Sequence, residues 1–223
     1  MHTVKNKMAI ADRRKREREQ RRKDIIGAAE KLFFARDYDE VTMDEIADEA
    51  EVNKALLYYY FKNKEALFFA VNLRGIKKLH EIHVECANLD TNGHSKLKAM
   101  GQGYFKFFMD HPDYFRILSQ AERFKITFNN DDAKATTDLL TEIWKLMVEV
   151  IMEGIEDGTI RDDLDPVELS IYFTLMGRGV LLVDPIFQKV LETRGITQDK
   201  FWKDLDRFLD PAITNRPCSD TRD

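Results

Sequence analysis

The chain has few of the residues that cross-link small domains or interrupt helices. Cys86 and Cys218 are its only cysteines, and two so far apart do not form a disulfide framework. Ten glycines and five prolines leave room for long uninterrupted helices. No apolar run approaches the roughly 18 residues of a membrane span, and the first residues lack the apolar segment of a secretory signal. We therefore expect a cytoplasmic protein with no membrane partner.

Catalytic signatures are also absent from the sequence. It has no glycine-rich phosphate loop, no GxSxG elbow around a nucleophilic serine and no HExxH zinc pair. His80, His83 and Cys86 recur three residues apart, but each such step turns a helix by about 300°, so the three side chains leave a common face. We interpret them as a polar pocket wall or plain surface. We predict that the protein is not an enzyme and needs no metal or cofactor.

Charge is unevenly distributed along the chain. The sequence has 35 basic and 40 acidic side chains, a net charge of −5. Residues 13–23, RRKREREQRRK, hold eight basic and two acidic side chains, a local charge of +6, so the remainder carries −11. A basic segment on an acidic body indicates a polyanionic partner bound at one end. A solvated leader helix with internal salt bridges is the alternative.

Helical periodicity predicts an all-α protein. Ile25, Ala29 and Phe33 recur at helical spacing from Asp24 onward, and no segment alternates like a half-buried strand. Later helices are predicted over residues 95–110, 113–124 and 131–157.

Capping residues mark the other helix starts. Thr42 and Glu45 form a capping box for a second helix. Asn53 caps a third helix, and Asn63 caps a fourth that runs to about residue 88. The starts of the last helices are marked by Asp165-Pro166, Asp184-Pro185 and Thr197, the last helix ending near Leu209.

The second and third helices, joined by a tight turn, form a helix-turn-helix unit over about residues 43–62. Leu57 and Phe61 lie four residues apart and face the core, so Tyr59 falls on the opposite side with Tyr58 on its flank. Tyrosine hydroxyls donate to phosphate oxygens, and the rings contact thymine methyls and sugars. This face is a candidate DNA-binding surface, and partial packing of Tyr58 and Tyr60 against neighbouring helices is the alternative.

Residues 25–67, IIGAAEKLFFARDYDEVTMDEIADEAEVNKALLYYYFKNKEAL, resemble the amino-terminal domain of the tetracycline-repressor-like (TetR) family of transcriptional regulators. LYYYFKNKEAL is the core of this likeness, and DGTIRDDLDP also resembles the family. The resemblance implies an N-terminal three-helix helix-turn-helix DNA-binding domain, joined by a long helix to a C-terminal helical ligand-binding and dimerisation domain. The expected division is a basic arm (1–23), the DNA-binding domain (24–70), the ligand-binding and dimerisation domain (71–213) and a tail (214–223).

The resemblance implies a repressor that binds a palindromic double-stranded DNA operator as a homodimer. A small hydrophobic effector, which the residues do not specify, would release it. The alternative is a helical hydrophobe-binding or interaction protein without operator-specific DNA binding. Two positions depart from the family: Glu51 stands where glycine is usual in the turn, and Ala55-Leu56 stand where Gly-Thr is frequent. We therefore expect a slightly different turn, and base readout by apolar contact.

The DNA-contacting residues follow from the resemblance and from the basic arm. Thr42 and Lys64 would hold phosphates, and the amino end of the third helix would approach base edges. The tyrosines would contact the backbone and groove. The full expected set is Arg14, Arg18, Arg21, Arg22, Thr42, Lys54, Ala55, Leu56, Tyr58, Tyr59, Tyr60, Lys62 and Lys64.

Aromatic residues in the C-terminal half predict an apolar effector pocket, with ordinary core as the alternative. The expected pocket residues are Tyr104, Phe105, Phe108, Phe115, Tyr172 and Met176. An apolar stripe on the charged last helix, and two glycines that would let a second backbone approach, indicate where subunits pair. The expected dimer interface, in the helices that the family pairs, is Gly177, Gly179, Phe201, Trp202, Leu205 and Phe208. Burial of these residues within one subunit is the alternative.

Overall fold

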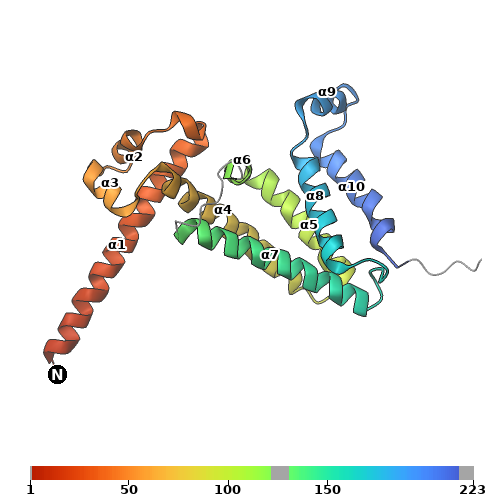
Figure 1. The fold of residues 1–223 in the computed structure, drawn as a ribbon, viewed down its shortest axis with the longest axis horizontal. Coiled ribbons are helices and arrows are strands. Elements are labelled where there is room, and N and C mark those ends of the chain that lie inside the picture. The colour runs from red at the N-terminus through yellow and green to blue at the C-terminus, as the bar shows by residue number, and fades with distance from the viewer. Residues whose placement is uncertain (1, 122–130, 216–223) are drawn as a thin grey trace, which may run out of the picture. The chain divides into compact units, whose positions relative to one another are not determined.

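The computed structural model describes the backbone of residues 2–121 and 131–215 and the side chains from Ala11 onward (Figure 1). In these ranges the regular structure is helical, apart from one isolated bridge between Ile160 and Thr214. The all-α prediction is confirmed. The helices are α1 His2–Ala35, a 3-10 helix Tyr38–Glu40, α2 Met43–Glu49, α3 Lys54–Tyr60, α4 Lys64–Ala87, α5 Gly93–Asp110, α6 Pro112–Ala121, α7 Asp131–Glu156, α8 Pro166–Leu181, α9 Pro185–Thr193 and α10 Gln198–Ile213.

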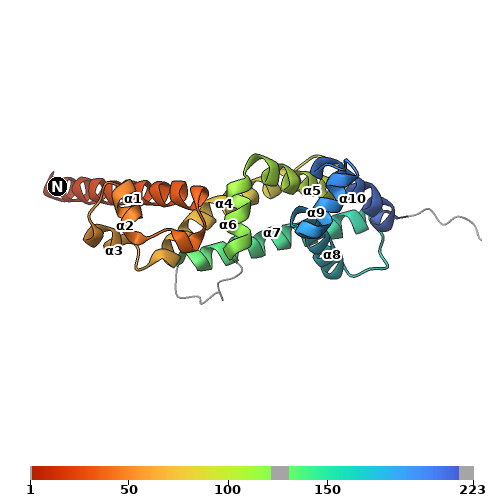
Figure 2. The same cartoon turned by 90° about the horizontal axis from the view of Figure 1, so that it is seen from above.

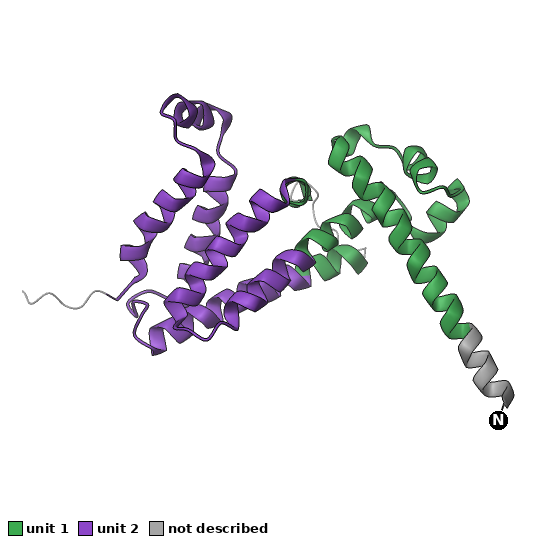
Figure 3. Ribbon diagram, turned by 180° about the vertical axis from the view of Figure 1, so that it is seen from behind, with its two compact units in different colours: residues 1–76, 113–137 green, residues 77–112, 138–223 purple. Residues whose placement is uncertain are grey.

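The chain forms two compact units, which Figure 3 shows in different colours. The first contains residues 1–76 and 113–137, and the second contains residues 77–112 and 138–223. The boundaries after residues 76 and 137 fall inside α4 and α7, so each of these helices passes from one unit into the other. The first unit is therefore completed by a segment far along the chain.

In the first unit, α1 extends well beyond α2 and α3 (Figure 1 and Figure 2). The sequence predicts a first helix from Asp24 with the basic arm as a separate segment, but α1 begins at His2 and includes the arm. Residues 13–23 consist of arginine, lysine, glutamate and glutamine, which are all strong helix formers. An ion pair between Arg13 and Glu17 (2.7 Å) links successive turns. Because nothing interrupts these residues, the arm continues the helix.

The predicted capping residues start the short helices. The Thr42 hydroxyl accepts a hydrogen bond from the backbone N–H of Glu45 (3.2 Å), and Glu45 Oε2 accepts one from the N–H of Thr42 (2.8 Å). These two bonds complete the capping box. Asn53 and Asn63 cap α3 and α4 by accepting from backbone N–H groups of the first turns, at 2.8 and 2.9 Å.

The turn between α2 and α3 contains one residue in the left-handed region, Glu51, with a φ of 52°. Glycine adopts this conformation freely, whereas a residue with a Cβ loses about 1–2 kcal/mol. The N–H of Val52 donates to the carbonyl of Ala47 (2.9 Å) and closes the turn. The turn thus keeps the left-handed backbone that glycine usually provides, in spite of the glutamate side chain.

α6 is joined to the carboxyl end of α1 by side-chain hydrogen bonds. Arg116 Nη2 donates to the carbonyl oxygens of Phe33 (2.7 Å) and Phe34 (2.9 Å), which lie in the last turn of α1 and have no helical partners. The Tyr114 hydroxyl donates to Glu30 Oε2 (2.8 Å). Burial and this carboxylate raise the pKa of Tyr114. α6 therefore completes the fold of the first unit, although it follows α5 in the chain. The last residues of the predicted 113–124 helix lie outside the described residues.

The second unit is built on a close crossing of α5 and α7. A methyl group on Gly93 would lie 2.2 Å from the backbone nitrogen of Gly154, so glycine is required at this contact. The surrounding core contains Leu97, Met100, Val150, Ile151, Ile160, Leu169 and Ile213. The side chains of Asp165, Asp184 and Thr197 cap α8, α9 and α10, as predicted. α10 continues one turn beyond the expected end near Leu209.

Candidate nucleic-acid interface

α3 presents two of its three tyrosines to solvent. The exposed fractions are 64% for Tyr59 and 50% for Tyr58, and Tyr60 is half-buried with its ring edge-on to Tyr59. Leu57 and Phe61 are buried at 0% and 2% exposure. The predicted orientation of this helix is confirmed, with Tyr59 as the most exposed ring.

The first turn of α3 is also accessible. Lys54 and Ala55 are exposed, and Leu56 is half-buried. The Lys54 ammonium donates to Asp44 Oδ2 (2.6 Å), and this contact raises the pKa of the lysine. Both partners are more than half exposed, so the pair contributes little free energy to folding. Lys54 therefore remains able to meet a phosphate or a base.

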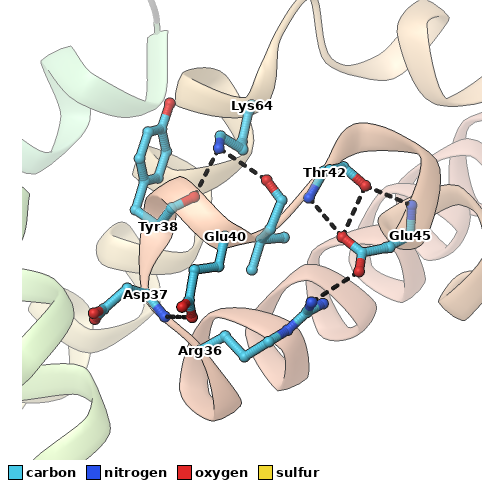
Figure 4. Close-up of polar contacts among 8 residues, drawn as sticks. Arg36, Asp37, Tyr38, Glu40, Thr42, Glu45 and Lys64 are labelled. Atoms are coloured by element: carbon cyan, nitrogen blue, oxygen red, sulfur yellow. Dashed lines mark hydrogen bonds and ion pairs between the residues drawn. The ribbon is translucent and has the colours of Figure 1, made fainter.

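A charged hydrogen-bond network surrounds the start of α2 (Figure 4). The Thr42 hydroxyl donates to Glu45 Oε2, and Arg36 Nη1 donates to Glu45 Oε1, each at 2.8 Å. The bonds from Arg36 and Thr42 lower the pKa of Glu45 to about 2. Thr42 is exposed in this network, so the predicted phosphate contact is sterically accessible.

Lys64 is held inside the first unit. Its ammonium donates to the carbonyl oxygens of Tyr38 (2.7 Å) and Val41 (2.8 Å) and lies 4.2 Å from the centroid of the Tyr38 ring (Figure 4). The backbone between α1 and α2 is irregular, so its carbonyl oxygens need side-chain donors. This internal role accounts for two of the three ammonium donors, and the phosphate contact of Lys64 stays a prediction.

Most of the expected cations of α1, and one that follows α3, are exposed. Arg14, Arg18 and Arg21 are exposed, as is Lys62 just after α3. Arg18 Cζ lies 5.4 Å from the centroid of the Tyr59 ring, which places this part of α1 beside the exposed face of α3. Lys15 is exposed three residues before Arg18 and is missing from the expected set. Helical periodicity, extended back from Ile25, is the signal that identifies it.

Arg22 is packed within the first unit, and its charge is paired within the chain. Its guanidinium carbon lies 5.0 Å from the centroid of the Phe61 ring. Its Nη2 lies 2.5 Å from Asp132 Oδ2 at the start of α7. Arg22 thus has an ion pair within the chain, and its expected phosphate contact stays a prediction.

Comparisons with known proteins agree with this geometry. Residues 25–71 match the TetR_N sequence profile, described as bacterial regulatory proteins of the tetR family. The chain is 37% identical over 189 residues to the probable HTH-type transcriptional regulator ArpR of Pseudomonas putida, across 78% of this chain and 87% of ArpR. The chain belongs to the TetR family of transcriptional regulators.

Other TetR comparisons extend over much of the chain. The HTH-type transcriptional activator FasR of Mycolicibacterium smegmatis is 31% identical over 145 residues, covering 65% of this chain and 61% of FasR. The structure of AibR in complex with isovaleryl coenzyme A and operator DNA matches with a TM-score of 0.66 at 21% identity, covering 86% of this chain and 98% of AibR. At that identity the structural match shows the fold alone. Membership of the TetR family makes this chain a DNA-binding transcriptional regulator and not an enzyme. The alternative without DNA binding is therefore set aside.

The residues expected to form the effector pocket are divided between the units of this TetR protein. Phe115 is buried in the first unit, whereas the others belong to the second. Tyr104, Phe105 and Phe108 are half-buried on α5, and Phe105 stacks on Trp202 of α10 at 5.1 Å. Tyr172 and Met176 are exposed on α8, at 46% and 38%. The prediction that these two residues line a pocket is not supported by their exposure.

The residues expected at a TetR dimer interface also differ in their burial. Trp202 is buried within the second unit, and a methyl group on Gly177 would lie 3.5 Å from its ring. These two residues pack α8 against α10 within one chain, as in the alternative interpretation. Gly179, in contrast, has open space beside it, and Phe208 is 73% exposed. Phe201 and Leu205 are half-buried.

α8 and α9 carry exposed apolar side chains beyond those that the sequence singles out. The exposed large residues of these two helices and the residue after α8 are Val167, Ile171, Tyr172, Leu175, Met176, Leu182, Ile186, Phe187 and Val190. No single described helix is long and apolar enough to cross a membrane; only α8 and α9 taken together, bent by 68° at their break, pass by length and composition. So much exposed apolar area on adjacent elements is typical of a protein–protein interface.

The histidines of α4 have different surroundings. His80 Nε2 lies 3.2 Å from Glu142 Oε2. His83 is buried, and its Nδ1 is 2.9 Å from the carbonyl oxygen of Leu79, the acceptor that fixes the proton on this nitrogen of the neutral ring. Burial lowers the pKa of His83 and raises that of the half-buried Cys86. In the described part of the chain, no group of three or more potential ligands is arranged to hold a metal ion.

Proposed function

We propose that this TetR regulator is a repressor that binds a palindromic operator as a homodimer and leaves it when a small hydrophobic effector binds. The observation that carries the proposal is the division of α3 into a fully buried side, with Leu57, and an exposed side, with Tyr59. A recognition helix must be fixed to its domain on one side while it presents side chains to the major groove on the other. We assign DNA binding to residues 24–70 together with the basic part of α1, in the cytoplasm.

The proposed contacts follow the exposure of each side chain. Lys54, Ala55 and Leu56 approach base edges at the amino end of α3. Ala55 and Leu56 have no side-chain donor or acceptor, so they read the sequence through apolar contacts such as thymine methyls. The exposed tyrosines contact sugars and phosphates. The proposed phosphate contacts are Thr42, Lys62, Arg14, Arg18 and Arg21.

The exposed stripe of α8 supports the homodimer. Tyr172, Leu175, Met176 and Gly179 lie on one side of this helix, because they are spaced by three or four residues. A glycine without neighbours in an apolar stripe allows close approach of a second helix. Phe208 adds exposed apolar area on α10, which packs against α8. We propose that these faces pair across a two-fold axis, as isologous interfaces require.

The effector site is proposed in the second unit, within residues 71–213. The candidates for its lining are the half-buried rings of Tyr104 and Phe108 and the buried His83, a mainly apolar set with few polar groups. Such a lining is typical of small-molecule sites. AibR, which has this fold, was solved with both isovaleryl coenzyme A and operator DNA, and this supports regulation of the present chain by a ligand.

Two helices give a physical route from effector to operator. α4 and α7 pass from one unit into the other, so a shift at one end of either helix displaces the other end. Two half-sites lie about 34–36 Å apart on one face of the duplex. Paired recognition helices tolerate little change in that spacing. A ligand that favours a different spacing therefore lowers operator affinity.

Selection of genomic DNA fragments with the purified protein tests the proposal. We expect the enriched fragments to share a palindrome and to bind with a dissociation constant of about 10⁻⁸ M or lower. Footprinting should show two protected half-sites about one helical turn apart. Fragments without a shared sequence would contradict operator recognition. An affinity that stays unchanged with every ligand shown to occupy the second unit would contradict effector release.

A further inference from the structure

The basic residues of α1 form one continuous front face. Successive residues of an α-helix turn by about 100°. With Arg18 as the reference, four other cations therefore fall within about 60° of it on the helix surface. These are Arg14, Lys15, Arg21 and Arg22. No acidic residue between 11 and 23 falls on this front face.

The remaining cations of residues 13–23 lie on the opposite side, the back face. Arg13, Arg16 and Lys23 are at least about 140° from Arg18 around the helix. Glu17 and Glu19 lie between the two faces, about 100° to either side. The glutamates therefore separate a purely basic front face from a back face on which Arg13 already pairs with Glu17 (2.7 Å).

The orientation of the front face is fixed by α3. Arg18 lies over the ring of Tyr59 at 5.4 Å, and Arg22 lies over the ring of Phe61 at 5.0 Å. One turn further, Ile25 on the same side is fully buried in the first unit. The front face is thus anchored at its carboxyl end beside the exposed tyrosines, and it continues from there as a helix along exposed residues (Figure 1).

The shape of duplex DNA decides how this face is used. An α-helix with its side chains is about 10–12 Å wide, whereas the minor groove is only about 6 Å wide. A helix that continues α1 is too wide for the minor groove, and α3 occupies the major groove in the proposed function. We propose that the front face of α1 binds the phosphate backbone of operator DNA just outside each half-site. This inference rests on the proposed function and deepens it, because it assigns the phosphate contacts of α1 to one helix face and places them outside the half-sites.

The length of the helix sets the reach of this contact. The eight residues from Ala11 to Arg18 are seven steps of the helix and span about 10 Å at about 1.5 Å per residue. Base pairs are spaced by about 3.4 Å along the duplex. The front face can therefore reach at most about three base pairs beyond the position of Tyr59. In this proposal α1 stays helical up to Ala11, so its cations are held in place without further ordering on DNA.

Two triple variants with equal charge test the inference. The front variant combines Arg14→Gln, Lys15→Gln and Arg21→Gln, and leaves Arg18 and Arg22 with their aromatic neighbours. The back variant combines Arg13→Gln, Arg16→Gln and Lys23→Gln. Both lose three positive charges, and glutamine keeps the helix propensity close to that of arginine and lysine. Circular dichroism checks that both variants keep their helix content.

We expect the front variant to bind the selected operator at least about tenfold more weakly than the parent protein. The slope of log affinity against log salt should fall by about 5.4, because the homodimer loses three phosphate contacts at each of two half-sites and each contact contributes about 0.9. Hydroxyl-radical protection should disappear at the outer edges of both half-sites. The back variant should change each quantity much less. Equal losses in the two variants, or none in either, would overturn the front-face assignment.

A second experiment distinguishes cations that are held on a continuous helix from cations that are only tethered to the first unit by a flexible segment. Glu19→Gly with Gln20→Gly keeps every cation but weakens the helix between the front face and its anchor. We expect outer protection to fade in this variant while protection by α3 persists. Unchanged outer protection would overturn the rigid contact. A parent protein that selects no operator would instead refute the proposed function itself, so the two failures are distinguishable.

Discussion

Arg22 and Asp132 form an ion pair across 110 residues of sequence, with 2.5 Å between Nη2 and Oδ2. The pair joins α1, which lies beside the recognition helix, to the first turn of α7. α7 then continues into the second unit. The contact between Arg22 and Asp132 thus joins the first turn of α7 to α1 within the first unit.

Replacing Asp132→Asn should destabilise the protein by about 1 kcal/mol, since the pair is only partly shielded from water. The Arg22 side chain is 39% exposed and that of Asp132 is 14% exposed. Urea unfolding measures the change. Asp131→Asn is the matched control, because it removes an exposed acid from the same helix turn without touching Arg22. Equal effects of the two changes would assign the loss to the helix dipole and not to the pair.

Two neighbouring residues of α3 should separate stability from DNA binding. Leu57→Ala removes a fully buried side chain and should cost about 2–5 kcal/mol of unfolding free energy. Tyr59→Ala, at a position 64% exposed, should change stability by less than about 0.5 kcal/mol. It should weaken operator binding by at least about tenfold, as the loss of one good contact does. Thermal unfolding and fluorescence anisotropy report the two effects. Full operator affinity in Tyr59→Ala would remove the tyrosine face from the interface.

Glu45 should make stability depend on pH in the acidic range. Hydrogen bonds from Arg36 and Thr42 lower the pKa of Glu45 from 4.5 to about 2 in the folded protein. The ionised carboxylate therefore stabilises the fold above about pH 4.5, and this contribution is lost as the pH falls towards about 2. Glu45→Gln should reduce the stability difference between about pH 6 and about pH 3. Arg36→Gln should reproduce part of this effect. Parallel pH profiles for parent and Glu45→Gln would show that the network contributes nothing.

A charge in the apolar stripe of α8 should separate the proposed dimer. Leu175 is 61% exposed in a single chain, so Leu175→Glu leaves the fold of the subunit intact. It would bury a carboxylate between two subunits, which is strongly unfavourable. Light scattering should give half the parent mass, and operator affinity should fall because two half-sites are no longer bound together. Met152→Glu, at an exposed apolar residue of α7, is the control. A dimeric Leu175→Glu protein would place the subunit interface elsewhere.

Short-range features of this fold can be read from the sequence. The caps at Thr42, Asn53 and Asp165 depend on residues within three positions, and all three make the expected bonds. The burial of Leu57 and the exposure of Tyr59 follow from the helical repeat alone. These features are predictable because the partners lie within one helical turn of each other.

Long-range contacts could not be predicted in the same way. The helical repeat tells which residues share a face, but not which element covers that face. Trp202 lies on an apolar face that α8 covers within the same chain, whereas Tyr172 lies on one that the chain leaves open. Lys64 likewise donates to carbonyl oxygens 26 and 23 residues earlier in the chain, and no local sequence pattern indicates these acceptors. The helical arm differs from these long-range contacts. Its helix follows from local composition, which by itself favours a continuous α1.

The hydrogen bonds from Arg116 to the last turn of α1 limit where such regulators can be cut to make hybrid proteins. A truncated head that stops at residue 76 would leave the carbonyl oxygens of Phe33 and Phe34 without their donor. A hybrid that grafts this head onto a foreign sensor should therefore import residues 113–137 as well. A single cut in the gene, after the long fourth helix, would divide the first unit, because this unit consists of two segments that are separate in the sequence.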